Sequence, residues 1–180
     1  LCISQKHPWK YPGLIIYLSE LHTFQERDVR ETRRDDYVKQ INVMKKTYHL
    51  CLSGGEEILF RDEADYNRGF NSLALTLHKT GSTGLVESFQ STHCHMMIQT
   101  DDPGGFIYAM RQSYSKYFNR KYGKSGRVGE KHHFTMEITG LYHHLAAMTY
   151  VLRNALHHGL VPIPYAYPHC SANAIFRKEM

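Results

Sequence analysis

The sequence contains no long apolar run. The apolar stretch Leu14–Leu18 is five residues long and lies beside proline and glycine, whereas a helix needs about 20 apolar residues to cross a bilayer. The same stretch is too short for the apolar centre of a signal peptide. We therefore expect no membrane contact, and we expect the protein to be cytoplasmic.

Paired cysteines are also lacking. The four cysteines, Cys2, Cys51, Cys94 and Cys170, are widely scattered and none forms a Cys-x-x-Cys pair. Their spacing argues against a structural zinc site and gives no disulfide framework. We expect these thiols to be reduced and mostly buried.

No compositional extreme sets the chain apart from ordinary globular proteins. Its 180 residues are 42% hydrophobic and 22% charged, which suits a single domain with a full core. The first part is different, because residues 26–39 are densely charged with mixed signs. We predict an N-terminal extension over residues 1–43, partly ordered at best, and a compact domain over residues 44–180.

Strand-like and helix-like segments alternate after residue 44. Apolar periodicity and turn residues predict strands at 47–52, 85–89, 93–99 and 133–138. They predict helices at 62–78 and 102–122, with Asp62 and Asp102 as N-caps. A third helix is expected from Thr139 or Gly140 to about His158, closed by Gly159. This order predicts an α+β sandwich with one sheet and helices packed on it.

The third helix has two stripes at helical spacing. Leu141, Leu145, Met148, Leu152 and Leu156 form the stripe that we expect to face the core. Tyr150 and Asn154 lie on the other stripe, one turn apart. They are either an ordinary surface pair or a phenol hydroxyl beside an amide oxygen that could ligate a metal.

The segment Ser91–Gln99 predicts a buried strand that carries two imidazoles. Alternate residues of a strand share a face, so His93 and His95 point one way while Cys94, Met96 and Ile98 point into the core. Two histidines at this spacing can bind one divalent metal. With thirteen histidines in the chain, an ordinary strand with one hydrogen-bonded and one exposed histidine is the alternative.

Positive charge is concentrated in one segment of a chain whose net charge is +5. The cations are Arg111, Lys116, Arg120, Lys121, Lys124, Arg127 and Lys131, and Tyr114, Tyr117, Phe118 and Tyr122 are interleaved with them. Cations for phosphates beside aromatic faces for bases are typical of single-stranded nucleic-acid binding. A solvated helix face with a few core aromatics is the other interpretation.

Three segments together resemble one family. They are His93-Cys94-His95, the stretch Tyr114–Gly123, and the stretch Tyr150–Val161, and they occur in the family's order at the right separations. Over roughly residues 46–170, the chain resembles the single-tyrosine HUH transposases, in particular the REP-associated tyrosine transposases. The resemblance implies a ferredoxin-like fold with an antiparallel sheet, and it does not cover residues 1–43.

The resemblance also implies roles for individual residues. His93 and His95 correspond to the HUH histidines, Tyr150 to the nucleophile, and Asn154 to the helix residue that completes the metal site. Mg²⁺ or Mn²⁺ is the expected cofactor, since carboxamide and phosphate oxygens join the imidazoles. Two departures occur: the chain has Ser91-Thr92 where members often have Pro-Asn, and Asn154-Ala155 where they often have Asn-Pro.

The implied activity is transposition of DNA in a prokaryotic cell. The enzyme would nick and rejoin single-stranded or hairpin DNA through a 5′-phosphotyrosine, and Arg111, Tyr114, Lys116, Arg120, Lys121, Lys124, Arg127 and Lys131 would bind the strand. One alternative is an inactive or domesticated hairpin-binding module on the same fold. A replication-initiator or relaxase nickase is another. The sequence leaves open a monomer or a homodimer.

Overall fold

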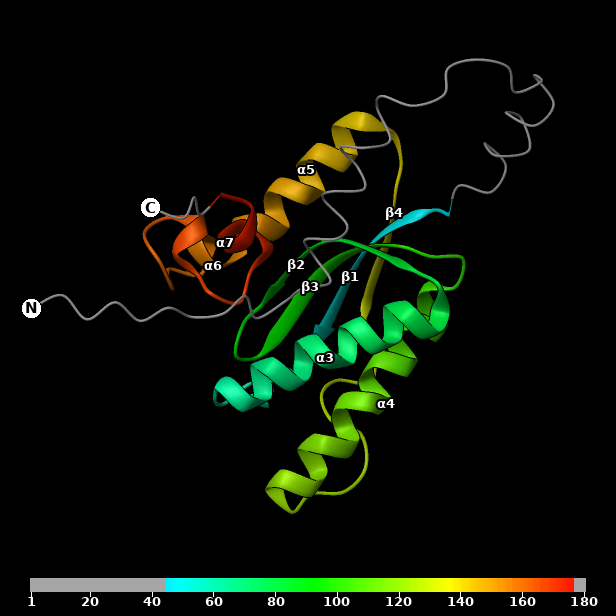
Figure 1. Cartoon of the computed structure of the whole chain (residues 1–180), viewed down its shortest axis with the longest axis vertical. Coiled ribbons are helices and arrows are strands. Elements are labelled where there is room, and N and C mark those ends of the chain that lie inside the picture. The colour runs from blue at the N-terminus through cyan, green and yellow to red at the C-terminus, as the bar shows by residue number, and fades with distance from the viewer. Residues whose placement is uncertain (1–44, 177–180) are drawn as a thin grey trace, which may run out of the picture. The chain divides into compact units, whose positions relative to one another are not determined.

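A four-stranded antiparallel sheet lies at the centre of the part of the chain that the structure describes (Figure 1). The computed structural model describes residues 45–176, so the expected extension over residues 1–43 lies outside the described residues. The strands are β1 (Thr47–Ser53), β2 (Thr83–Phe89), β3 (His93–Gln99) and β4 (Phe134–Ile138), in the order β2-β3-β1-β4. All three neighbouring pairs are antiparallel. The predicted strands are therefore confirmed.

Two long helices, α3 (Glu63–Thr80) and α4 (Pro103–Tyr122), pack on one face of this sheet (Figure 1). Asp62 and Asp102 cap their N-termini by accepting hydrogen bonds from the amides of Asp65 and Gly105. Both helices end at a glycine in the left-handed region, where other residues are strained. Strand, helix, two strands, helix and strand in this sheet order make the ferredoxin-like α+β fold that we predicted.

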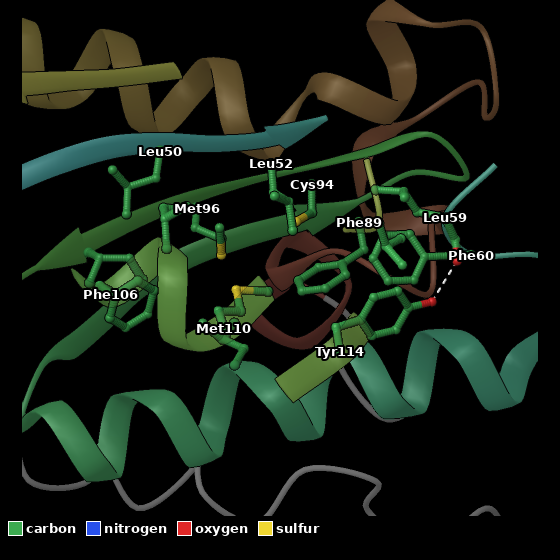
Figure 2. Packing of buried hydrophobic residues seen from close by; sticks show 14 of the residues in the cluster. Leu50, Leu52, Leu59, Phe60, Phe89, Cys94, Met96, Phe106, Met110 and Tyr114 are labelled. Carbon is green, nitrogen blue, oxygen red and sulfur yellow. Dashed lines mark hydrogen bonds between the residues drawn. The ribbon is translucent and has the colours of Figure 1, made fainter. Parts of the chain in front are cut away.

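The main core lies between the sheet and these two helices. Strand alternation sends one set of side chains into it, and Figure 2 shows several of them packed against the helices. The strand residues are Leu50, Leu52, Phe89, Cys94, Met96 and Ile98, and all are at most 3% exposed. The prediction that Cys94, Met96 and Ile98 face the core is confirmed. Their strand neighbours, including the two histidines, consequently point to the opposite face.

Helix α5 (Gly140–Leu152) covers that opposite face, and it uses a different stripe from the predicted one. Ala147 and Val151 are buried against Met97 and Val86 of the sheet. The prediction that Leu141 and Leu145 face the core is wrong, because they are 74% and 53% exposed. Small side chains let the helix lie close to the sheet, and the first turns extend past the strands (Figure 1).

The third helix does not run unbroken to His158. It stops at Leu152, Arg153 adopts φ −96° and ψ 3°, and a short α6 (Asn154–His157) follows. The Cys170 thiol lies 3.7 Å from the Leu152 carbonyl oxygen, a carbonyl left at the end of α5. Periodicity alone cannot detect this break, because the group that meets the carbonyl comes from the end of the chain.

The C-terminal part extends the edge of the sheet at β2. After the 3₁₀ turn η1 (Pro164–Ala166), the amide of Phe89 donates to the carbonyl of His169, and Ser88 pairs with Cys170. Helix α7 (Ser171–Phe176) follows. Within residues 45–176, no helix has both the length and the apolar character that a membrane span requires.

Candidate functional site

His93 and His95 share the sheet face that α5 covers. Their ring centroids are 5.1 Å apart, and their planes are nearly perpendicular. His95 is 8% exposed, and His93 is half-buried at the start of β3. The predicted common face is therefore present, and neither imidazole is a surface side chain.

Asn154 reaches this pair from the first residue of α6. Its side chain is fully buried, and its Oδ1 lies 3.3 Å from Nε2 of His93. An amide oxygen only accepts, so this contact is a hydrogen bond only in the tautomer of His93 that carries its proton on Nε2, whereas in the other tautomer both atoms present lone pairs to a cation. The Nδ2 group of Asn154 is buried with no partner among the described residues. The break at Arg153 thus places a partly unsatisfied amide beside an imidazole.

Tyr150 stands over the second histidine. The ring centroids of Tyr150 and His95 are 5.2 Å apart with an interplanar angle of 86°. The tyrosine is 44% exposed, so solvent or a ligand can reach this side chain. The four residues that the sequence singled out for the catalytic and metal positions therefore converge at one place between β3 and the helices α5 and α6.

A fifth residue of this cluster, His49, is absent from the sequence-based prediction. It comes from β1, it is 5% exposed, and its Nε2 lies 3.0 Å from Nδ1 of His95. Its ring centroid is also 5.7 Å from that of Tyr150. Alternation in β1 sends His49 to the sheet face that Leu50 does not use, and this pattern could have identified His49 from the sequence. Only the pairing of β1 with β3 brings it to His95.

Burial keeps these imidazoles neutral at pH 7. It lowers the pKa of His95 to about 3, with neighbouring imidazoles acting in the same direction. It lowers the pKa of His49 to about 4, and His143 adds to this effect. Burial also lowers the pKa of His93, against the opposing hydrogen bond to Asn154. Neutral imidazoles have the lone pairs that a metal ligand needs.

The donor set at this place is mixed. Among residues 45–176, no group of three or more histidine, cysteine, aspartate or glutamate side chains is arranged to hold a metal. Two imidazoles and the Asn154 amide oxygen are the available donors. Such a set fits a hard divalent ion that also takes oxygens from water or substrate better than it fits a closed zinc site.

A pocket of about 540 Å³ opens beside Tyr150, between α5 and the strands β1, β3 and β4. Its lining is mainly apolar, with imidazoles at several points. The lining residues are His49, Cys51, His95, Phe134, Met136, His143, Ala146, Ala147 and Tyr150. Phe134 is 48% exposed, and its ring centroid lies 5.2 Å from that of His49 in an edge contact. A flat, partly aromatic ligand such as a nucleobase matches this lining in chemistry.

Part of the predicted nucleic-acid surface belongs to the fold instead. The prediction that Tyr114 offers a stacking face is wrong, because it is 2% exposed and its hydroxyl donates to the Leu59 carbonyl at 2.5 Å (Figure 2). Lys121 forms ion pairs with Asp62 and Asp65 at 2.7 Å. Tyr114 is buried because it lies on the face of α4 that packs against the core.

Two more cations of the segment are engaged within the molecule. Lys124 pairs with Glu57. Arg111 is half-buried and donates to the Lys131 carbonyl at 3.2 Å. Burial, followed by the nearby Arg127, lowers the pKa of Arg111. These side chains contribute to the local structure around α4 as well as to the surface charge.

The remaining cations are exposed, and they lie in two places. Lys116 and Arg120 are on α4, which packs on the sheet face opposite to Tyr150. Arg127 and Lys131 lie in the loop between α4 and β4. This loop reaches the end of the sheet where His93 lies. The Glu130 amide donates to the carbonyl of Ser53, and Ser53 pairs with His93.

Comparison with known proteins gives a fold. No protein-family profile matches the chain, and no curated protein matches it in sequence. The structure of a REP-associated tyrosine transposase bound to a REP hairpin is similar over 82% of this chain and 84% of that chain, with a TM-score of 0.64 and 9% identity. The chain therefore has the fold of that transposase.

A second similar structure is that of a candidate transposase from Deinococcus radiodurans. It is 12% identical, with 70% of this chain and 97% of that chain covered and a TM-score of 0.46. A TM-score this low supports no conclusion about the function of this chain.

Proposed function

We propose that this protein is a single-tyrosine DNA-strand transferase that nicks and rejoins single-stranded, hairpin-associated DNA during transposition. The observation that carries the proposal is the convergence of Tyr150, His95 and the His93–Asn154 pair at one partly exposed place. The REP-associated transposase that shares the fold is bound to a hairpin, and this supports hairpin DNA as the substrate class.

The nucleophile in this proposal is the Tyr150 hydroxyl. Its oxygen attacks the phosphorus, its proton leaves to solvent, and the bond from phosphorus to the 3′-oxygen breaks. The products are a 5′-phosphotyrosine and a strand that ends in a 3′-hydroxyl after taking up a proton. A different 3′-hydroxyl can then attack the phosphotyrosine and release Tyr150, so rejoining needs no nucleotide cofactor.

His93, His95 and Asn154 would hold Mg²⁺ or Mn²⁺, because two neutral imidazoles and a buried amide oxygen fit such an ion. When bound, the ion would supply Lewis-acid polarisation of a non-bridging phosphate oxygen, which helps because a phenol hydroxyl is a weak nucleophile. The chain itself orients the strand and holds Tyr150 against the His95 ring.

The substrate strand would follow the exposed cations and enter the pocket. Arg127 and Lys131 lie in the loop that reaches the His93 end of the sheet, so they are well placed for phosphates near the scissile bond. The pocket beside Tyr150 would take an unpaired base next to that phosphate, stacked on Phe134. Lys116 and Arg120 would contact a more distant part of the hairpin.

The experiment that tests this proposal compares the wild type with Tyr150→Phe. Each protein is incubated with end-labelled hairpin oligonucleotides that carry single-stranded flanks, with Mn²⁺ or with EDTA, and a denaturing gel is read for a covalent adduct. We expect an adduct only from the wild type with Mn²⁺, and equal hairpin binding by both proteins.

Cleavage that persists in Tyr150→Phe would overturn the assignment of the nucleophile. Tight hairpin binding by the wild type, with no adduct from any oligonucleotide, would favour a hairpin-binding module. Tyr142→Phe is the matched control, since Tyr142 lies on the same helix and is 87% exposed.

A further inference from the structure

His49 makes a contact that neither metal ligation nor nucleophilic attack explains. It lies on β1, it is buried, and its Nε2 faces Nδ1 of His95 at 3.0 Å. The two rings are 43° from coplanar with centroids 5.1 Å apart, so the short contact is between nitrogens and not a ring stack. A buried hydrogen bond between two histidine side chains calls for a physical explanation.

The two facing nitrogens share one proton. The ring that carries it determines whether Nε2 of His95 has a free lone pair for a metal ion. A neutral imidazole has one N–H and one lone pair. If His49 donates, Nδ1 of His95 is the acceptor and the proton of His95 sits on Nε2, which then has no lone pair for a metal. If His95 donates from Nδ1, its Nε2 is free to ligate.

The first histidine of the pair has the same arrangement. Nδ1 of His93 lies 3.1 Å from the hydroxyl of Thr92, while its Nε2 points to Asn154 at 3.3 Å. Both histidines therefore engage Nδ1 with a neighbour, and His93 directs Nε2 toward the amide. A hydroxyl can donate or accept, and so can an imidazole, so Thr92 and His49 can each serve a ligating histidine.

We propose that His49 is a positioning residue that accepts the Nδ1–H hydrogen bond of His95 and so keeps Nε2 of His95 as the free, ligand-competent nitrogen. This inference rests on the proposed metal site and deepens it. Metal-binding histidines generally donate their second N–H to a protein acceptor, which fixes both tautomer and ring orientation. Here the acceptor is supplied by the neighbouring strand.

The first test needs neither metal nor DNA. Long-range ¹H–¹⁵N correlation spectra of the full chain, labelled with ¹⁵N-histidine, report which nitrogen of each ring is protonated. We expect His95 to carry its proton on Nδ1 and His49 to accept at Nε2. A proton on Nε2 of His95 in the wild type would overturn the proposal.

The second test uses variants and Mn²⁺ alone. His49→Leu removes the acceptor, while His49→Gln keeps an amide oxygen that can accept. We expect His49→Leu to weaken Mn²⁺ binding by about 10–100-fold, as measured by titration calorimetry, and to shift the proton of His95 toward Nε2. His49→Gln should bind Mn²⁺ close to the wild type, and thermal melts confirm that each variant is folded.

Equal Mn²⁺ affinity in the wild type and a folded His49→Leu would overturn the proposal. Equal losses in the Gln and Leu variants would do so too, because the effect would then come from packing. A wild type that shows the expected tautomer and Mn²⁺ affinity but forms no DNA adduct would sink the proposed transferase activity and leave the role of His49 intact.

Discussion

Nε2 of His93 and Oδ1 of Asn154 lie 3.3 Å apart although 61 residues separate them in the chain. One comes from the first residue of a strand and the other from the turn that follows a broken helix. The contact exists because α5 ends at Leu152 and Arg153 redirects the backbone, so that Asn154 is fully buried.

Asn154→Ala should weaken Mn²⁺ binding at least about tenfold, because it removes the amide oxygen that would join the two imidazoles as a ligand. Titration calorimetry of the metal-free protein measures this change. Asn154→Asp keeps an oxygen and should retain binding. Asn173→Ala makes the same chemical change at a side chain that bonds the Tyr165 carbonyl, and it should leave the affinity unchanged. A wild-type affinity in Asn154→Ala would contradict the ligand set.

The two groups of exposed cations should differ in their effect on DNA binding. Removing Arg127 and Lys131 together should weaken binding of a short single strand more than removing Lys116 and Arg120, because the loop pair lies at the His93 end of the sheet. Each lost phosphate contact should lower the salt dependence, the slope of log K against log salt, by about 0.7. Fluorescence anisotropy at several salt concentrations measures both quantities. A larger loss from the helix pair would contradict this path.

Phe134→Leu should weaken binding of a strand whose unpaired base enters the pocket. The expected loss is about 1–3 kcal/mol, because this is what base stacking on an aromatic ring contributes. A strand with an abasic residue at that position should bind both proteins equally. The quenching of 2-aminopurine, placed in turn at each position beside the cleaved bond, locates the base. Tyr108→Leu is the control, since Tyr108 is an exposed aromatic on α4. Equal quenching in both variants and the wild type would exclude the pocket as a base site.

The Asp65 carboxylate should make the stability depend on acid pH. Burial would raise its pKa, but hydrogen bonds from Lys121, Tyr122, the Arg61 amide and Tyr117 outweigh that effect and lower it. A carboxyl whose pKa is lower in the folded state stabilises the fold fully above its unfolded pKa. That stability is lost as the pH falls through the folded value.

The free energy of unfolding should therefore decrease as the pH is lowered below about 4. Asp65→Asn should cost about 2 kcal/mol at pH 7, and the difference from the wild type should shrink in acid. Urea unfolding at a series of pH values measures this. A difference that stays constant down to acid pH would show that Asp65 acts through packing rather than charge.

Local patterns in the sequence were sufficient to predict the strands, the two long helices and the pair of histidines that β3 contributes to the site. Alternation in Ser91–Gln99 placed His93 and His95 on one face, and the caps Asp62 and Asp102 marked where the two long helices begin. These features depend on a few neighbouring residues, because strand alternation and capping are properties of the local backbone. The α+β class and the order of elements followed from them, and the ferredoxin-like fold was implied by the family resemblance.

Only the tertiary structure decided the features that depend on distant contacts. The α5 stripe was predicted from hydrophobicity, but close packing on the sheet selects Ala147 and Val151 and leaves Leu141 exposed. Tyr114 was predicted to offer a stacking face because cations surround it in the sequence, yet it lies on the side of α4 that packs into the core. His49 joined the site only through the pairing of β1 with β3. Periodicity shows which residues share a face, whereas the choice of what covers each face is made by contacts between segments far apart in the chain.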